Sequence, residues 1–263
     1  MRFIFIRHGE PDYVTNTLTE NGVKEAEALK ERVIKWDVKD FYVSPLGRAK
    51  ATAEPSLKAL GRTATEYDWL QEFYIPIMDP TTNTEHCTWD LMPRDFTADP
   101  LMMDKDHWFD SKIYRQYPEI KERALHVYEE TDKFVAKYGY IRKGDFFEFK
   151  DPTGHVNPAS AKDIMLHGTS SYVPRDEDDK ETVVIFCHLG ITCLMIARLI
   201  GISPVILWQY TCIAPTGVTI LNTEKRIDNE VHFRIQALGD TSHLYKEGVK
   251  ISGYGSFAYT FQG

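Results

Sequence analysis

The sequence lacks any long hydrophobic run and contains little cysteine. No stretch of about 18 apolar residues occurs, which is the length that a helix needs to cross a membrane. The four cysteines in 263 residues show no Cys-x-x-Cys spacing, so neither a disulfide framework nor a structural metal site is indicated. We therefore expect a cytoplasmic protein that avoids membranes and uses no metal or cofactor.

The chain is also short of positive charge. It has 31 Lys and Arg against 39 Asp and Glu, a formal net charge of -8. Nucleic-acid binding depends on many contacts of Lys and Arg with phosphates, so the excess of acidic over basic residues argues against a nucleic-acid partner. A small phosphorylated ligand remains compatible, because the local field in a cleft can oppose the net charge. With 43% hydrophobic and 13% aromatic residues, the composition is typical of a packed globular core.

The strongest pattern is a short apolar run that ends in a cationic pair. Phe3–Ile6 reads as a strand buried on both faces, because such strands run apolar without alternation. Arg7 and His8 follow at its carboxyl end, and Gly9 permits a sharp turn there. Ligands of open α/β sheets bind outside the carboxyl ends of the strands, so the pair is placed to hold an anion beside a nucleophile. Taken alone, the tripeptide fits a surface pair at a strand end equally well.

Two further apolar segments lead to groups of the same kind. One precedes Ser44 and Pro45, which we expect to cap and begin a helix that carries Arg48. The other spans residues 182–187 and is followed by His188. Helix N-termini favour phosphate, and three strands would bring cationic or imidazole groups to one edge of the sheet.

In this order, the segments resemble the signatures of the histidine phosphatase superfamily, also called the phosphoglycerate mutase-like family. The resemblance covers about residues 1–73 and 182–244. It implies an α/β fold, a three-layer α/β/α sandwich with a mostly parallel central sheet. The matching residues are Arg7-His8-Gly9, Leu18, Thr19, Gly22, Ala26, Ser44, Pro45, Arg48, Ala49, Thr52, Ala53, Leu70, Glu72, His188 and Asp240–Leu244.

The resemblance implies a role for each residue of the site. His8 is the nucleophile, attacking phosphorus as a neutral imidazole whose other nitrogen donates to a backbone carbonyl. Arg7 and Arg48 hold phosphoryl oxygens, and His188 supplies a further donor. Glu72 is the proton donor, which requires a raised pKa.

The segment that carries Glu72 lies next to a region that does not align with the family pattern. Three other carboxyls lie close to Glu72 in the sequence and stay open as alternatives. They are Asp68, Asp79 and Glu85.

Two positions depart from the family pattern. Leu189 stands where the family often has glycine directly after the late histidine, and we expect it to form a wall of the site in a slightly different loop. Val14 stands where related enzymes often have a phosphate-contacting asparagine. Asn16 is a candidate to replace that asparagine.

The rest of the chain is expected to form one domain over residues 1–263, with an inserted lid at about residues 74–180. Pro55 should bend or divide its helix. The expected helices are residues 19–36, 44–60, 120–138 and 191–200; the expected strands are residues 41–43, 63–67, 218–221 and 231–238, with a hairpin at 140–150.

Together these features predict a metal-independent phosphomonoesterase that hydrolyses a small phosphorylated metabolite. Two alternatives stay open: a mutase that moves a phosphoryl group within one molecule, and a non-catalytic module that binds a phosphorylated ligand. The expected partner is a small-molecule phosphate ester, and a homo-oligomer is compatible with the sequence.

Overall fold

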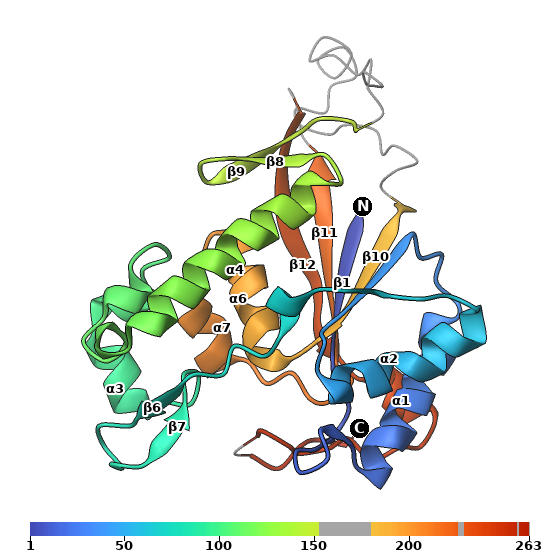
Figure 1. Cartoon of the computed structure of the whole chain (residues 1–263), viewed down its shortest axis with the longest axis horizontal. Coiled ribbons are helices and arrows are strands. Elements are labelled where there is room, and N and C mark those ends of the chain that lie inside the picture. Colours follow the sequence, from blue (N-terminus) through green and yellow to red (C-terminus); the bar gives the residue numbers. More distant parts are fainter. Residues whose placement is uncertain (153–179, 226–228, 257, 263) are drawn as a thin grey trace.

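A mixed eight-stranded sheet forms the centre of the molecule, a computed structural model that describes residues 1–152, 180–225, 229–256 and 258–262 (Figure 1). Its strands are β1 (Arg2–Arg7), β4 (Asp40–Val43), β5 (Thr65–Glu66), β8 (Tyr140–Lys143), β9 (Phe146–Phe149), β10 (Thr182–Cys187), β11 (Val218–Lys225) and β12 (Glu230–Asp240). They follow the order β5-β4-β10-β1-β11-β12-β9-β8. The chain thus has the α/β fold that the sequence predicted.

The sheet has a parallel half and an antiparallel half. The four strands β5, β4, β10 and β1 pair in parallel, and the other strands pair antiparallel. Arg7 pairs with Cys187, and Phe186 pairs with Val43, so three parallel strands end level with one another. This register brings the residues that follow β1, β4 and β10 to one edge of the sheet.

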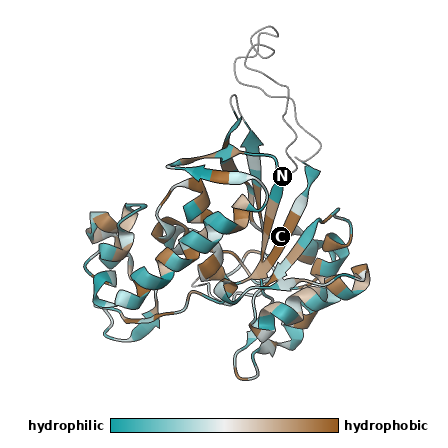
Figure 2. Cartoon of the chain, turned by 45° about the horizontal axis from the view of Figure 1, so that its top comes forward, coloured by the Kyte–Doolittle hydropathy of each residue, from teal (hydrophilic) through white to brown (hydrophobic). Residues whose placement is uncertain are grey.

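Helices cover both faces of the sheet. The helices are α1 (Glu20–Val33), α2 (Gly47–Leu60), α4 (Pro118–Ala136), α6 (Leu189–Ile200), α7 (Pro204–Tyr210) and α8 (Ser242–Lys246). Phe3 and Phe5 of β1 lie in the core cluster that includes side chains of α4, α6 and α7, whereas Ile4 and Ile6 lie in the cluster with α1 and α2. Figure 2 shows the hydrophobic colour concentrated along the central strands. Because both faces are buried, β1 runs apolar without alternation.

The helix starts partly match the expectations. Thr19 caps α1, its hydroxyl accepting from the backbone N–H of Gly22 at 3.1 Å, as predicted. Ser44 and Pro45 neither cap nor begin α2, because Leu46 occupies the cap position. The prediction for both was therefore wrong. Pro55 lies inside α2, which continues to Leu60 instead of dividing.

The region after residue 74 is loop-rich and well packed. It contains β6 (Pro76–Met78), β7 (Glu85–Cys87), α3 (Pro93–Ala98) and short 3₁₀ turns at Pro100–Met103, Trp108–Asp110 and Tyr114–Gln116. Met102, Trp108 and Tyr114 are completely buried. The hairpin β8–β9 joins the central sheet through β12. Residues 153–179 of the expected lid lie outside the described residues.

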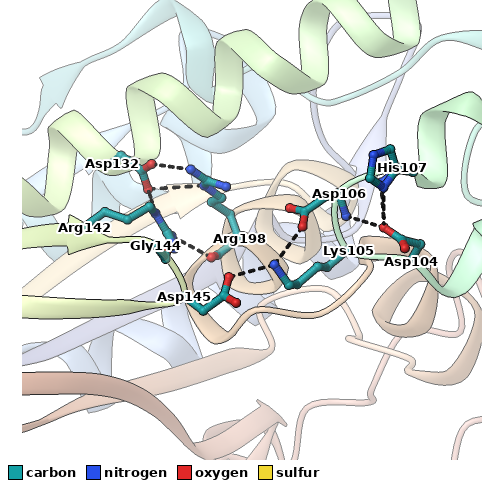
Figure 3. A network of polar contacts seen from close by, with 9 residues as sticks. All are labelled: Asp104, Lys105, Asp106, His107, Asp132, Arg142, Gly144, Asp145 and Arg198. Carbon is teal, nitrogen blue, oxygen red and sulfur yellow. Dashed lines mark hydrogen bonds and ion pairs between the residues drawn. The ribbon is translucent and has the colours of Figure 1, made fainter.

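A polar network holds α4, α6 and the hairpin together (Figure 3). Asp132 of α4 accepts from Arg142 Nε of β8 at 2.8 Å and from Arg198 Nη2 of α6 at 2.6 Å. Arg142 also donates to the backbone carbonyl of Arg198 at 2.7 Å. Lys105 pairs with Asp145 at the hairpin turn. These bonds tie the region before α4 to the layer that carries α6.

The remaining short elements are β2 (Pro11–Asp12), β3 (Thr17–Leu18) and a 3₁₀ turn at Asp68–Leu70. β2 and β3 pair as a small hairpin directly after the first strand of the sheet. Within the part of the chain that the structure describes, no helix combines the length and the apolar character of a membrane span.

Candidate active site

His8 follows β1 and is held in one tautomer. Its Nδ1 lies 2.7 Å from the backbone carbonyl oxygen of Gly9, so Nδ1 carries the proton and donates it, and Nε2 is the basic nitrogen. Burial lowers the pKa of His8 well below its usual value, and the charges of Arg7 and Arg48 add to this effect. The imidazole is therefore neutral at neutral pH, the form that a nucleophile requires.

Gly9 is needed for close packing and not for an unusual backbone conformation, because its φ lies outside the left-handed region. A Cβ atom at this position would lie 2.9 Å from the carbonyl oxygen of Gly22 in α1. The backbone N–H of Gly9 donates to Thr52 Oγ1 of α2 at 2.8 Å. The loop that carries His8 is thus fixed by the first two helices.

Arg7 and Arg48 bring two buried guanidinium groups to the same place. Their exposed fractions are 5% and 8%. Arg7 Nη1 donates to the carbonyl oxygen of Ile213 at 2.6 Å, and Arg48 Nη1 donates to Asn16 Oδ1 at 3.1 Å. Within the described residues, neither forms an ion pair with a carboxylate, and the Nε of each has no hydrogen-bond partner. Buried charge without a counter-ion is costly, so this arrangement favours a bound anion.

His188 follows β10 and completes the group. Its ring centroid lies 5.1 Å from that of His8, and its Nε2 lies 2.7 Å from Ser44 Oγ, which follows β4. Burial lowers the pKa of His188 well below its usual value, and the nearby His8, Arg48 and Arg7 lower it further. Ser44 thus contacts the second imidazole instead of capping a helix.

Glu72 lies on the loop after the Asp68–Leu70 turn and reaches the start of α6. Its Oε1 accepts from the backbone N–H groups of Phe73 at 2.8 Å and Ile191 at 3.1 Å. Burial raises the pKa of Glu72, although these hydrogen bonds and the charge of Arg7 oppose the shift. A carboxyl with a raised pKa is suited to hold and donate a proton.

The three other carboxyls considered as proton donors are placed differently. Asp68 and Glu85 are exposed. Asp79 is buried, but its Oδ1 accepts from the backbone N–H groups of Thr81 and Thr82 in its own turn. Of the four candidates, Glu72 is the one whose charge acts on both Arg7 and Arg48.

The two departures from the family pattern are accommodated without strain. Leu189 is the first residue of α6, and its φ lies outside the left-handed region. It is half-buried and packs against the main core cluster. Val14 is 95% exposed, whereas Asn16 adopts a φ of 52° and accepts from Arg48. Asn16 is therefore next to the site, in contact with one of its arginines.

The structure adds residues that the sequence did not single out. The backbone N–H of Thr216 contacts the carbonyl oxygens of Arg7 and His8 at 3.1 and 3.2 Å. Its hydroxyl lies 3.1 Å from Nε2 of His243, which belongs to a matched segment. Thr216 has a φ of 55°, and a Pro-Thr-Gly sequence such as the one around it is typical of a turn and gives no sign of a contact with the site. Tyr13 also lies over Arg48, with its ring centroid 5.1 Å from the guanidinium carbon.

Comparison with known proteins places this chain in a family. Residues 3–139 match the model of the histidine phosphatase superfamily (branch 1). A search of curated protein sequences finds no significant match.

Several solved structures are similar in fold. A mycobacterial glucosyl-3-phosphoglycerate phosphatase in complex with inorganic phosphate is 15% identical, with a TM-score of 0.55, and the match covers 92% of this chain and 98% of that chain. A variant of Entamoeba histolytica phosphoserine phosphatase in complex with phosphoserine is 16% identical over the same shares, with a TM-score of 0.51. YhfR of Bacillus stearothermophilus is 19% identical, again over 92% and 98%, with a TM-score of 0.50.

At such low identities the structural matches show a shared fold. The family model, in contrast, matches more than half of the sequence, including the segments that carry Arg7, His8, Arg48 and Glu72. The chain belongs to the histidine phosphatase superfamily.

Proposed function

We propose that this protein is a metal-independent phosphomonoesterase that hydrolyses a small phosphorylated metabolite through a phosphohistidine at His8. One observation carries the proposal. Two buried guanidinium groups and two neutral imidazoles lie together, and within the described residues no carboxylate forms an ion pair with either arginine. Such a site favours a phosphoryl group, whose oxygens match the planar donors of arginine.

In the first step, the lone pair of His8 Nε2 attacks phosphorus. The P–N bond forms while the ester P–O bond breaks, and the leaving oxygen takes the proton of the Glu72 carboxyl. Arg7 and Arg48 stabilise the negative charge on the phosphoryl oxygens, and His188 supplies another donor. The raised pKa of Glu72 supports its role as the acid.

In the second step, water attacks the phosphohistidine. The Glu72 carboxylate takes a proton from this water, the P–N bond breaks and its electron pair returns to Nε2. Inorganic phosphate then leaves, and Glu72 is again protonated. The Nδ1 proton stays in its bond to Gly9 throughout, so the imidazole keeps its orientation.

The organic group of the substrate is proposed to contact the region after residue 74. Trp89 of this region lies against Gly190, since a Cβ atom added to Gly190 would be 2.6 Å from the Trp89 ring. The side chain of Gln209 donates to the backbone carbonyl oxygen of Trp89. The phosphatases of similar fold are named for phosphoserine and glucosyl-3-phosphoglycerate, both small phosphate esters. We propose a substrate of that size and a single domain over 1–263, with residues 74–180 as its insertion.

A phosphate-release assay tests this function. The assay covers a panel of phosphorylated metabolites, with and without EDTA, for the wild type and His8→Ala. We expect release that EDTA leaves unchanged and that His8→Ala lowers by more than about 10³-fold, because a covalent nucleophile is lost.

Two other results would contradict hydrolysis. Isomerisation of 3-phosphoglycerate without free phosphate would identify a mutase. Tight binding of phosphate esters without turnover, in the wild type and His8→Ala alike, would identify a binding module.

A further inference from the structure

A segment close to the C-terminus reaches the anion site. We call residues 251–256 the tail. Ile251 packs against Ala28 and Leu244, and the backbone N–H of Ser252 donates to Glu25 Oε1 at 3.3 Å. At Gly255, a Cβ atom would lie 3.2 Å from Nη2 of Arg7. The tail backbone therefore lies directly against one of the two site arginines.

The tail also reaches the second arginine through two aromatic rings. Tyr254 lies 5.6 Å from Tyr13, centroid to centroid, with the rings tilted by 52°. Tyr13 in turn covers the guanidinium carbon of Arg48 at 5.1 Å. Tyr13 is 54% exposed and Tyr254 is 42% exposed, whereas Arg48 is 8% exposed. The two tyrosines are thus an outer layer that separates Arg48 from solvent.

The loop that carries Tyr13 keeps its shape by other means. Asp12 Oδ1 accepts from the backbone N–H groups of Val14 and Thr15, which closes a short turn. Within the described residues, the hydroxyls of Tyr13 and Tyr254 form no hydrogen bond, so the rings themselves make the contact. Loss of either ring should leave the loop folded and remove support from Arg48 alone.

We propose that Tyr13 and Tyr254 form an aromatic pair that positions the Arg48 guanidinium for the phosphoryl group, which makes the tail a part of the anion site. The inference rests on the proposed function in one respect, the role of Arg48 as a phosphate ligand. Tyr13 and Tyr254 are positioning residues, because they act through Arg48. Their effect should concern the phosphoryl group itself and be the same whatever organic group is attached.

The first test measures the binding of inorganic phosphate by isothermal titration calorimetry. Tyr254→Ala should weaken binding by about 3- to 10-fold, the typical value of one aromatic or cation–π contact. Tyr254→Phe keeps the ring and should bind as the wild type does. Tyr259→Ala is the matched control, since Tyr259 is on the same C-terminal segment, is fully exposed and has no ring contact within the described residues.

The coupling of the two tyrosines provides a second readout. If Tyr254 acts through Tyr13, the double variant Tyr13→Ala, Tyr254→Ala should bind phosphate about as weakly as Tyr13→Ala alone. With two different phosphate esters as substrates, Tyr254→Ala should lower kcat/KM by the same factor. A defect in the contacts with the organic group would affect the two esters unequally.

The outcomes separate this inference from the proposed function. If Arg48→Ala loses phosphate binding and Tyr254→Ala retains it, the inference is overturned while the phosphatase proposal stands. If binding depends on Tyr254 but no ester is hydrolysed, the inference stands and the phosphatase proposal fails. A wild-type protein that binds no phosphate overturns both.

Discussion

Burial shifts the pKa values of His8 and Glu72 in opposite directions, and each shift favours the neutral form. For the imidazole this means a low pKa and a free lone pair on Nε2. For the carboxyl it means a raised pKa and a proton available to the leaving group. The same low-polarity surroundings therefore favour the neutral forms of His8, the proposed nucleophile, and of Glu72, the proposed acid.

Glu72→Gln tests the acid at the residue scale. Glutamine keeps the size and an acceptor for Phe73 and Ile191 but has no acidic proton. We expect kcat/KM for an alkyl phosphate, which reports on the steps up to departure of the leaving group, to fall by about 10²- to 10³-fold, as is typical for loss of general acid–base catalysis. The loss should be much smaller for p-nitrophenyl phosphate, whose leaving group needs no protonation. Equal losses for both substrates would argue against the acid role.

Glu25 gives a second prediction, on stability. This carboxyl is fully buried and accepts from the backbone N–H groups of Glu10, in the loop after His8, and Ser252, in the tail. Burial raises the pKa of Glu25 from 4.5 to about 7. The folded state therefore binds more protons than the unfolded state between these two values, so this group lowers the free energy of unfolding as pH rises through that window.

The size of the Glu25 effect follows from the shift, which corresponds to at most about 3 kcal/mol. The destabilisation that ionised Glu25 causes is absent below about pH 4.5 and complete above about pH 7. Urea unfolding of the wild type and Glu25→Gln at several pH values should show that the wild type loses stability relative to the variant between pH 5 and 8. A constant difference between the two proteins would show that Glu25 has an ordinary pKa.

Some site residues could be predicted because each comes directly after an apolar strand or within a motif. Arg7, His8 and His188 follow strands whose ends the register aligns. Tyr13 and Tyr254 could not be predicted, because they lie in an exposed loop and a late irregular segment with no periodicity. Their contact depends on the path of the tail across the site, which only the three-dimensional fold defines.

At the scale of elements, the first turn of α6 determines where Glu72 can lie. Gly190 is its second residue, and a Cβ atom there would lie 2.8 Å from Glu72 Oε1 and 2.6 Å from the ring of Trp89. The absence of a side chain at this position lets the carboxyl approach the backbone N–H of Ile191. The helix start therefore serves the acid, although helix N-termini often bind phosphate.

Gly190→Ala is expected to displace Glu72 and to lower kcat/KM in the same leaving-group-dependent way as Glu72→Gln, by about 10-fold or more. Gly144→Ala is the control, because it replaces a glycine in the turn of the β8–β9 hairpin, with a φ of 65° and open space around it. This control should lose some stability but keep its kcat/KM. Wild-type kcat/KM in Gly190→Ala would show that the close contact has no influence on the acid.

Most elements could be predicted from periodicity and strand pattern, and two of the features that could not be predicted depend on contacts between residues far apart in the sequence. Ser44 satisfies the cap rule in its residue type, yet its hydroxyl contacts His188, a partner 144 positions away in the sequence. Pro55 leaves α2 undivided. The hairpin around Gly144 was predicted, but its pairing with β12 is a long-range contact that no local pattern encodes.

At the scale of the whole molecule, a chain with a net charge of -8 holds two buried arginines at one sheet edge, and neither forms an ion pair with a carboxylate in the part of the chain that the structure describes. Asp and Glu outnumber Lys and Arg, and several of these carboxylates form ion pairs elsewhere, as Asp132 does with Arg142 and Arg198. Among the described residues, no acidic side chain lies within ion-pair distance of Arg7 or Arg48, and the carboxyl whose charge acts on both is Glu72, which has a raised pKa.

Transfer of a phosphoryl group to His8 can be tested by trapping the phosphohistidine. The protein is mixed rapidly with a substrate from the panel, quenched in alkali, and its peptides are analysed by mass spectrometry. The account predicts one acid-labile phosphoryl group on the peptide that contains His8, and none on this peptide in His8→Ala. A phosphoryl group on another residue, or wild-type hydrolysis by His8→Ala, would contradict it.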